Sequence, residues 1–284
     1  MRSIACSMRV CRNLIRYLFT SSAPYFVAFS LLIFMWDRGC SIGLVARQYN
    51  LNIHAGGYFA ILVNNNLTLI LLSFGLLFIL ADAPYLHENA LFEWTRTSRI
   101  SWATGRIIYI ALTVIIYMLF VQLLVCLLTW SINFGPKWDK VLNTIGMGRP
   151  VKGLSINISP LLVTKWNPIQ AMGLTWLLLF LAWFFIGLTL FFLSSAVSRL
   201  FALSTVSILI FLDYFIETMM PYRAYFFSPL SWAKLAIIGD DTNPYLPHLD
   251  YSLRALPLLC LILIILCVWV SVRKKHLLDR LFEL

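Results

Sequence analysis

Two acidic residues, Asp213 and Glu217, lie four positions apart inside a long apolar run, a spacing that puts both on one face of a helix. Ionisable groups inside a membrane-spanning helix are costly, so each is a functional candidate by default. The pair could form a polar wall of a translocation path or a titrating proton site. In the structural alternative, Glu217 lies at the outer interface, and Asp213 is hydrogen-bonded within the bundle or paired with a base such as Arg223.

A second polar group lies early in another apolar run, where Asn64, Asn65 and Asn66 are followed by Thr68. Side chains of this kind bind neighbouring helices together in membranes, mark the end of a helix, or contact cargo. Asn65 is therefore a third candidate for a translocation path.

The other reactive residues form no recognisable catalytic or metal site. The cysteines include no Cys-x-x-Cys pair, and the histidines are scattered along the chain. No His-Glu-x-x-His or Gly-x-x-x-x-Gly-Lys-Ser/Thr motif occurs. We therefore expect a chain that is not an enzyme, holds no metal or cofactor itself, and depends on another protein for any ATP hydrolysis.

The composition defines the setting of these candidates. Of the 284 residues, 61% are hydrophobic and 12% are charged, against about 45–50% and 25% in average soluble proteins. The mean hydropathy is +0.84. These values exclude a soluble enzyme, a disordered chain and a secreted disulfide scaffold, and they indicate a polytopic membrane protein with one transmembrane domain over 1–284. On so apolar a chain, the net charge of +10 indicates basic membrane-flanking loops rather than nucleic-acid binding.

Six apolar runs are long enough to cross a bilayer. They lack the period-2 alternation of membrane β-strands, so they predict an all-α fold with six transmembrane helices. The runs are about Leu18–Trp36, Tyr58–Ala81, Ile107–Ile132, Ile169–Val197, Leu200–Met220 and Leu253–Val272.

An even number of spans places both termini on one side of the membrane. Basic residues crowd against the span ends on that side, so the positive-inside rule predicts cytoplasmic N- and C-termini. No small-x-small cleavage pattern follows Trp36, so we expect an uncleaved first span rather than a signal peptide.

Three outer segments have appreciable length: 37–57, 133–168 and 221–252. The last is rich in proline and aromatic residues, and it predicts short interfacial or re-entrant helices lying over the bundle. Within the middle segment, Asn167 and Pro168 predict the start of a helix.

The inner segment 82–105 predicts a short amphipathic helix along the membrane surface, since Asp82 can cap a helix that Pro84 opens. Apolar residues then recur at helical spacing, and Arg96 and Arg99 follow. The alternative is that this segment only anchors the chain at the membrane interface.

The stretch Ala81-Asp-Ala-Pro-Tyr85, the short helix, and the sequence Arg96-Thr-Ser-Arg-Ile-Ser-Trp-Ala-Thr-Gly-Arg-Ile-Ile-Tyr109 together resemble bacterial ABC transporter permeases of the ABC-2 type. The likeness is to the six-span permeases common in Firmicutes. It implies that segment 82–105 is a cytoplasmic coupling helix between helices 2 and 3, with outer interfacial helices between helices 5 and 6. The implied residues for coupling to an ATPase are Leu86, Glu88, Leu91, Phe92, Trp94, Arg96 and Arg99.

The resemblance implies a permease subunit in the bacterial cytoplasmic membrane, working with a second permease chain, the same or related. Two cytoplasmic ATPase subunits would supply ATP and Mg. The expected function is export of an amphipathic peptide, antibiotic or lipid-type cargo. The alternatives are a proton-coupled secondary transporter using Asp213 and Glu217, and a non-transporting sensor or immunity subunit of an ABC complex. A lipid-modifying membrane enzyme is disfavoured, because no nucleophile, base or metal cluster converges.

Overall fold

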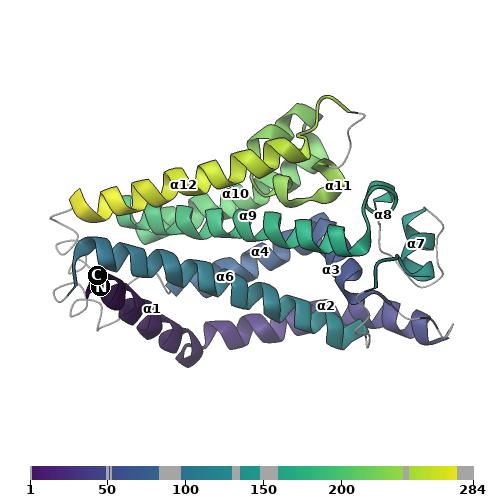
Figure 1. Ribbon diagram of the computed structural model, residues 1–284, viewed down its shortest axis with the longest axis horizontal. Helices are drawn as coiled ribbons and strands as arrows, with labels where there is room; N and C mark the ends of the chain where they lie inside the picture. Colours follow the sequence, from purple (N-terminus) through teal and green to yellow (C-terminus); the bar gives the residue numbers. More distant parts are fainter. Residues whose placement is uncertain are drawn as a thin grey trace.

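The structure is a computed structural model that describes residues 2–48, 51, 53–82, 97–129, 135–147, 159–238 and 243–273. Within these ranges every regular element is a helix (Figure 1). Arg99 lies inside the described ranges. The other residues expected to couple to an ATPase lie outside them: Leu86, Glu88, Leu91, Phe92, Trp94 and Arg96.

Four of the described helices are long and apolar enough to cross a membrane, and two bent helix pairs raise the number to as many as six. The prediction of an all-α polytopic membrane protein is confirmed at this level. The helices are α1 (Arg2–Thr20), α2 (Ala23–Gln48), α3 (Ala55–Asn64), α4 (Asn66–Asp82), α6 (Arg99–Thr129), α7 (Lys140–Gly146), α8 (Pro160–Lys165), α9 (Pro168–Ala196), α10 (Arg199–Met219), α11 (Leu235–Ile238) and α12 (Leu249–Arg273), with 3-10 helices η1 (Tyr222–Phe227) and η2 (Ser231–Ala233).

Where a strong local signal marks the start of a helix, the sequence predicts the first residue of that helix correctly. Helix α9 begins at Pro168, as predicted, because proline needs no hydrogen-bond partner for its nitrogen in the first turn. Asn167 before it has extended backbone, and its N–H donates to Gln170 Oε1 at 3.5 Å. The short helices η1, η2 and α11 occupy the proline- and aromatic-rich segment, as expected.

The first two predicted spans are each broken, which corrects the prediction of continuous helices. Residues Cys6–Thr20 and Ala23–Trp36 meet at 57°, and Ala55–Asn64 and Asn66–Ala81 meet at 90°. The first break has a local cause: Pro24 cannot donate a backbone hydrogen bond to the carbonyl four residues earlier, so it starts a new helix. The predicted run Leu18–Trp36 therefore crosses an elbow between α1 and α2.

The long helices run between two ends of the molecule (Figure 1). Helices α1, α6 and α10 begin at one end, and α12 finishes there. We call it the basic end, because Arg9, Arg12, Arg99 and Arg273 lie on the parts of α1, α6 and α12 that reach it. Helices α7, α8 and α11 lie at the opposite, aromatic end. The first described helix therefore starts, and the last described helix finishes, at the same end of the molecule.

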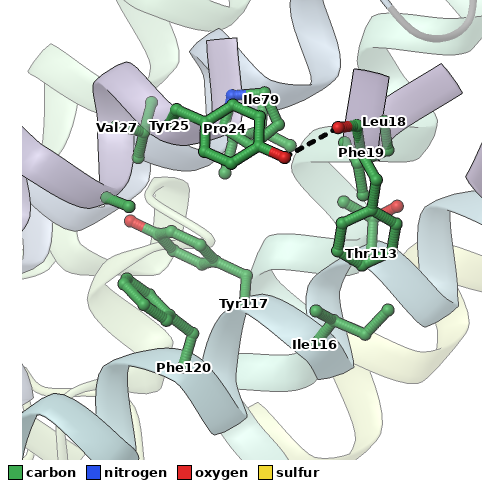
Figure 2. Close-up of a pocket in the computed structure, with 11 residues that line it drawn as sticks. Leu18, Phe19, Pro24, Tyr25, Val27, Ile79, Thr113, Ile116, Tyr117 and Phe120 are labelled. Atoms are coloured by element: carbon green, nitrogen blue, oxygen red, sulfur yellow. Dashed lines mark hydrogen bonds between the residues drawn. The ribbon is translucent and has the colours of Figure 1, made fainter. Parts of the chain in front are cut away.

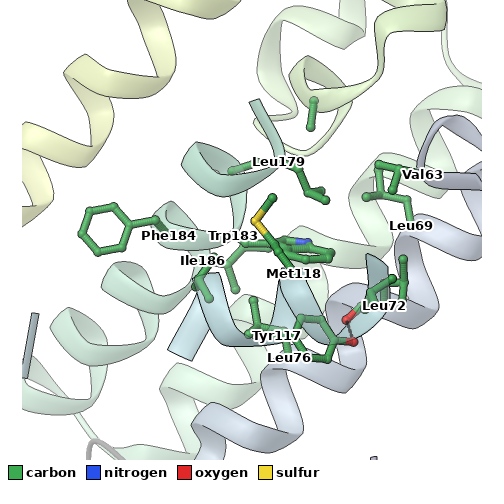
Figure 3. Packing of buried hydrophobic residues seen from close by; sticks show 14 of the residues in the cluster. Val63, Leu69, Leu72, Leu76, Tyr117, Met118, Leu179, Trp183, Phe184 and Ile186 are labelled. Carbon is green, nitrogen blue, oxygen red and sulfur yellow. Dashed lines mark hydrogen bonds between the residues drawn. The ribbon is translucent and has the colours of Figure 1, made fainter. Parts of the chain in front are cut away.

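Helix α9 runs through the centre of the bundle and is the most buried of the four long helices. Its Trp183 is fully buried, and Nε1 donates to Ser73 Oγ of α4 at 3.0 Å. The Trp183 ring also lies 5.2 Å from the ring of Tyr117 on α6, whose hydroxyl donates to Leu72 O at 2.8 Å. Figure 3 shows Leu72, Tyr117 and Trp183 close together, on α4, α6 and α9 respectively. One tryptophan therefore joins the three central helices.

Helix α1 is amphipathic and packs along the first part of α6. It buries Val10, Leu14 and Leu18, residues separated by about one helical turn. The approach is close at Gly105, where an added Cβ would lie 2.8 Å from the backbone oxygen of Ser7. The opposite face of α1 carries exposed arginines.

At the aromatic end, His54 holds the start of α3 to the chain before α7. Its Nδ1 accepts the backbone N–H of Gly57 at 2.8 Å, so Nε2 carries the proton and donates to Gly135 O at 2.5 Å. The backbone N–H of His54 donates to the carboxylate of Asp139. Partial burial raises the pKa of that carboxyl above its usual value, and the His54 N–H opposes the rise.

We expect His54→Ala to lower the thermal midpoint of unfolding. The variant loses the Gly57 and Gly135 hydrogen bonds, each worth about 0.5–1.5 kcal/mol. Fluorescence-detected unfolding in a fixed detergent measures the change. The exposed Lys137, in the same part of the structure, provides the control, and an equal midpoint for His54→Ala and Lys137→Ala would contradict the role given to His54.

Candidate functional site

A buried charged cluster joins three parts of the chain at the aromatic end. Its centre is Lys234, whose Nζ lies 2.5 Å from Asp213 Oδ2 and 2.9 Å from Glu217 Oε2. The same ammonium donates to Asn66 Oδ1 at 2.9 Å. We call Lys234, Asp213, Glu217, Asn66 and Ser231 the Lys234 cluster.

The number of N–H donors on the central lysine of the cluster equals the number of acceptors around it. A lysine ammonium has three N–H donors, and Lys234 has three acceptors within 2.9 Å. The other oxygen of Asp213 accepts from the hydroxyl of Ser231. The side chains of Lys234 and Asp213 are 1% and 0% exposed, whereas that of Glu217 is 40% exposed. Buried charges persist only when paired in this way.

Local sequence explains how the cluster is assembled. Asp213 and Glu217 are one turn apart on α10 and reach the same ammonium, as their spacing predicts. Lys234 directly follows η2, a single 3-10 turn whose Ser231 carbonyl accepts the N–H of Lys234 at 3.0 Å. The neighbouring Trp232 is buried, and its Nε1 donates to Tyr225 O at 2.7 Å. The tryptophan thus anchors the turn that presents the lysine.

The three consecutive asparagines make the break between α3 and α4 and attach it to the last outer segment. Asn64 Oδ1 accepts the backbone N–H of Ala236 at 2.7 Å, and Asn66 binds Lys234. Between them, Asn65 Oδ1 accepts the N–H and hydroxyl of Thr68 at 3.3 and 3.2 Å, capping α4. Asparagine side chains compete with helical backbone bonds, which favours a break here.

The structure therefore brings together two of the three residues predicted for a translocation path. Asp213 and Glu217 share one cation, while Asn65 caps α4 beside the cluster. The alternative of a base paired with Asp213 is right in kind but wrong in residue. The guanidinium of Arg223 lies over the ring of Tyr245, 4.8 Å from its centroid, and the partner of Asp213 is Lys234.

Sequence reasoning missed Lys234 as a site residue, although a signal was present. The lysine stands in the apolar stretch Trp232-Ala-Lys-Leu235 with two unpaired acids upstream on the adjacent span. Intramembrane charges pair with one another, so an isolated cation in an apolar outer segment is a natural partner for isolated carboxylates.

At the basic end, Arg99 makes a different contact. Its Nη1 donates to the carbonyl of Val272, in the last turn of α12, at 2.8 Å. An arginine on a C-terminal carbonyl of a helix satisfies an acceptor that has no partner within the helix. Arg99 thus links the start of α6 to the end of α12.

The arrangement of the Lys234 cluster favours holding helices in place over chemical reaction. The ammonium of Lys234 and both oxygens of Asp213 already have partners, and Asp213 is closed off from solvent. Among the described residues, no three His, Cys, Asp or Glu side chains gather where they could hold a metal ion. Comparison with protein-family models, curated proteins and solved structures gives no match. Fold and site together define a helical membrane protein whose aromatic end is held by buried charges.

Proposed function

We propose that this chain is the membrane-spanning subunit of an ATP-driven exporter, of the ABC-2 permease type, working with ATPase subunits supplied by other chains. The observation that carries the proposal is the placement of two helix ends. Helix α4 ends at Asp82 and α6 begins at Arg99, both toward the basic end. A cytoplasmic ATPase acting there would move two long helices directly.

The contacts of these helices extend such a movement in two directions. Through the bond from Arg99 to Val272, a displacement of α6 also reaches α12. A displacement of α4 reaches Asn66, at the opposite end of that helix, and through Asn66 it reaches Lys234. Energetic coupling between distant sites travels through rigid elements and contiguous polar contacts of this kind. The geometry supports a mechanism in which the ATPase displaces helices at the basic end and this displacement reaches the Lys234 cluster at the aromatic end.

Proton-coupled transport is the weaker candidate. A proton site needs a carboxylate that exchanges protons with water during the cycle. Asp213 is buried and bound to Lys234 and Ser231, and Glu217, which reaches water, is held by the same ammonium. The exported substrate in this proposal is an amphipathic peptide, antibiotic or lipid.

Removing the Trp94 side chain is expected to weaken binding of the ATPase about tenfold or more, as truncation of a docked aromatic anchor does. The experiment purifies the tagged chain from its native membrane in a mild detergent. Mass spectrometry then identifies a partner with a phosphate-binding loop, and ATP hydrolysis by the complex is measured. Trp36→Ala serves as the matched control, since Trp36 is exposed on α2, far along the chain from segment 82–105.

The expected result is that the parent and Trp36→Ala retain the ATPase while Trp94→Ala loses it at unchanged thermal stability. Arg99→Glu should lose the ATPase as well, with some loss of stability, because it also breaks the bond to Val272. Recovery of the parent chain without any ATPase, or equal recovery with Trp94→Ala, overturns the proposal.

A further inference from the structure

An apolar cavity of about 340 Å³ opens at the elbow between α1 and α2. Its size lies within the range of ligand-binding pockets, about 300–1,000 Å³. Figure 2 shows the rings of Phe19, Tyr25, Tyr117 and Phe120 arranged around the opening. The lining comes from α1 (Leu18, Phe19), α2 (Pro24, Tyr25, Val27, Ala28), α4 (Ile79) and α6 (Thr113, Ile116, Tyr117, Phe120).

The cavity has a buried floor and an exposed rim. Val27, Ile79 and Tyr117 are buried, whereas Phe19 and Tyr25 on the rim are exposed. With an exposed apolar rim, the cavity opens to the surface of the described part of the chain, the surface that lipid covers when these helices lie in a membrane. The hydroxyl of Tyr25 donates to the carbonyl of Phe19 at 2.8 Å and holds the elbow open. The cavity is therefore preformed, which lowers the entropic cost of filling it.

A row of arginines leads to this rim along α1. Arg9, Arg12, Arg16 and Phe19 follow one another at intervals of three or four residues, so they share one face of the helix. All four side chains are exposed. Arg16 is about one helical turn, roughly 5.4 Å, from the cavity rim, and Arg12 is one turn further toward the basic end.

We propose that the elbow cavity binds one acyl chain of an anionic phospholipid from the leaflet at the basic end, with the lipid phosphate on Arg12 and Arg16. An apolar slot beside two guanidinium groups matches a molecule that is apolar at one end and anionic at the other. Guanidinium groups bind phosphate through paired hydrogen bonds. The inference is independent of the proposed export function, since it uses only α1, α2, α4 and α6.

The bound lipid has a structural consequence. Its chain fills the space that the bend of 57° leaves between α1, α2 and α6. Its headgroup holds α1 in the interface, where an amphipathic helix with basic residues on its polar face binds anionic membranes. Lipid composition thereby sets the angle at the elbow.

The test uses the purified full chain in nanodiscs that contain a phosphatidylglycerol with a photoactivatable group in its acyl chain. Parallel nanodiscs contain phosphatidylcholine with the same chain. Mass spectrometry maps the labelled peptides. Ala28→Trp, on α2, fills the cavity from its wall, and the control Leu127→Trp places the same side chain at an exposed position on α6 outside the cavity lining.

Labelling by phosphatidylglycerol should fall on the peptides that contain Ile116 and Ala28, and Ala28→Trp should abolish it while Leu127→Trp does not. The double variant Arg12→Gln/Arg16→Gln should reduce that labelling by about tenfold or more, as expected for two charges each worth about 1 kcal/mol. Arg199→Gln, which removes an exposed arginine at the same end, should leave it unchanged.

Equal labelling by phosphatidylcholine and phosphatidylglycerol would overturn the proposal, because the arginines would then have no part in binding. Labelling that survives Ala28→Trp would overturn it as well, since the chain would then lie outside the cavity. The thermal midpoint of each variant, measured in the same nanodiscs, separates loss of binding from loss of fold.

Discussion

Replacing Lys234 with methionine is expected to destabilise the protein by about 3–5 kcal/mol, because the change leaves Asp213 buried without its cation. Methionine keeps much of the side-chain volume, so the loss reports charge rather than packing. It also leaves Asn66 without the donor that connects α4 to the outer segment. Thermal unfolding in a fixed detergent and the monodisperse fraction on gel filtration measure the effect.

Two further variants make this result specific. Lys137→Met changes an exposed lysine near the same end of the molecule, and its midpoint should match that of the parent. The double variant Lys234→Met/Asp213→Leu should recover part of the lost stability, since removing both buried charges removes the cost of desolvating either one. Glu217 remains, but its carboxylate reaches water. A Lys234→Met variant as stable as the parent would show that the cluster does not hold the aromatic end together.

Truncating Trp183 to alanine should cost about 3–5 kcal/mol, the range found for large buried aromatic residues. The change opens a cavity where α4, α6 and α9 meet (Figure 3) and removes the indole N–H that donates to Ser73 Oγ. Trp183→Phe should cost much less, because a ring remains to pack on Tyr117. The expected loss of stability for Trp183→Phe is close to the value of one hydrogen bond, about 1 kcal/mol, plus the cost of a small cavity.

The same unfolding assay separates these two substitutions. Trp36→Ala is the control for loss of an exposed tryptophan, and it should leave the midpoint nearly unchanged. If Trp183→Phe were as unstable as Trp183→Ala, the hydrogen bond to Ser73 rather than packing would dominate. If neither variant differed from the parent, Trp183 would not be a central contact of the bundle.

Helix boundaries were predictable where one residue decides them. Pro168 starts α9 in any context, and the apolar run after it continues without interruption to Ala196. The breaks in the first two spans were harder to predict. At the break around Asn65, the asparagine side chains are held by distant partners: Asn66 binds Lys234, and Asn64 accepts the N–H of Ala236. Periodicity within a span carries no information about such distant partners.

The residues of the candidate site also differ in how well the sequence predicts them. Asp213 and Glu217 stand out because a charge within an apolar run is costly wherever the run folds. Lys234 lies in a continuous buried stretch, residues 230–235, that follows the exposed Phe227 in the same outer segment. Its burial follows from how this segment packs against the bundle, which a hydropathy pattern does not determine.

The distance along the chain between the members of the Lys234 cluster has a consequence for biosynthesis. Translation produces Asp213 before Lys234, and at about 5–20 residues per second the interval is roughly one to four seconds. During that time Asp213 has no cation partner. Helix α10 either enters the membrane with this unpaired acid or waits at the surface of the insertion machinery. Pairing of the two charges therefore marks a late step, at which the preceding helices are already made and the outer segment closes over them.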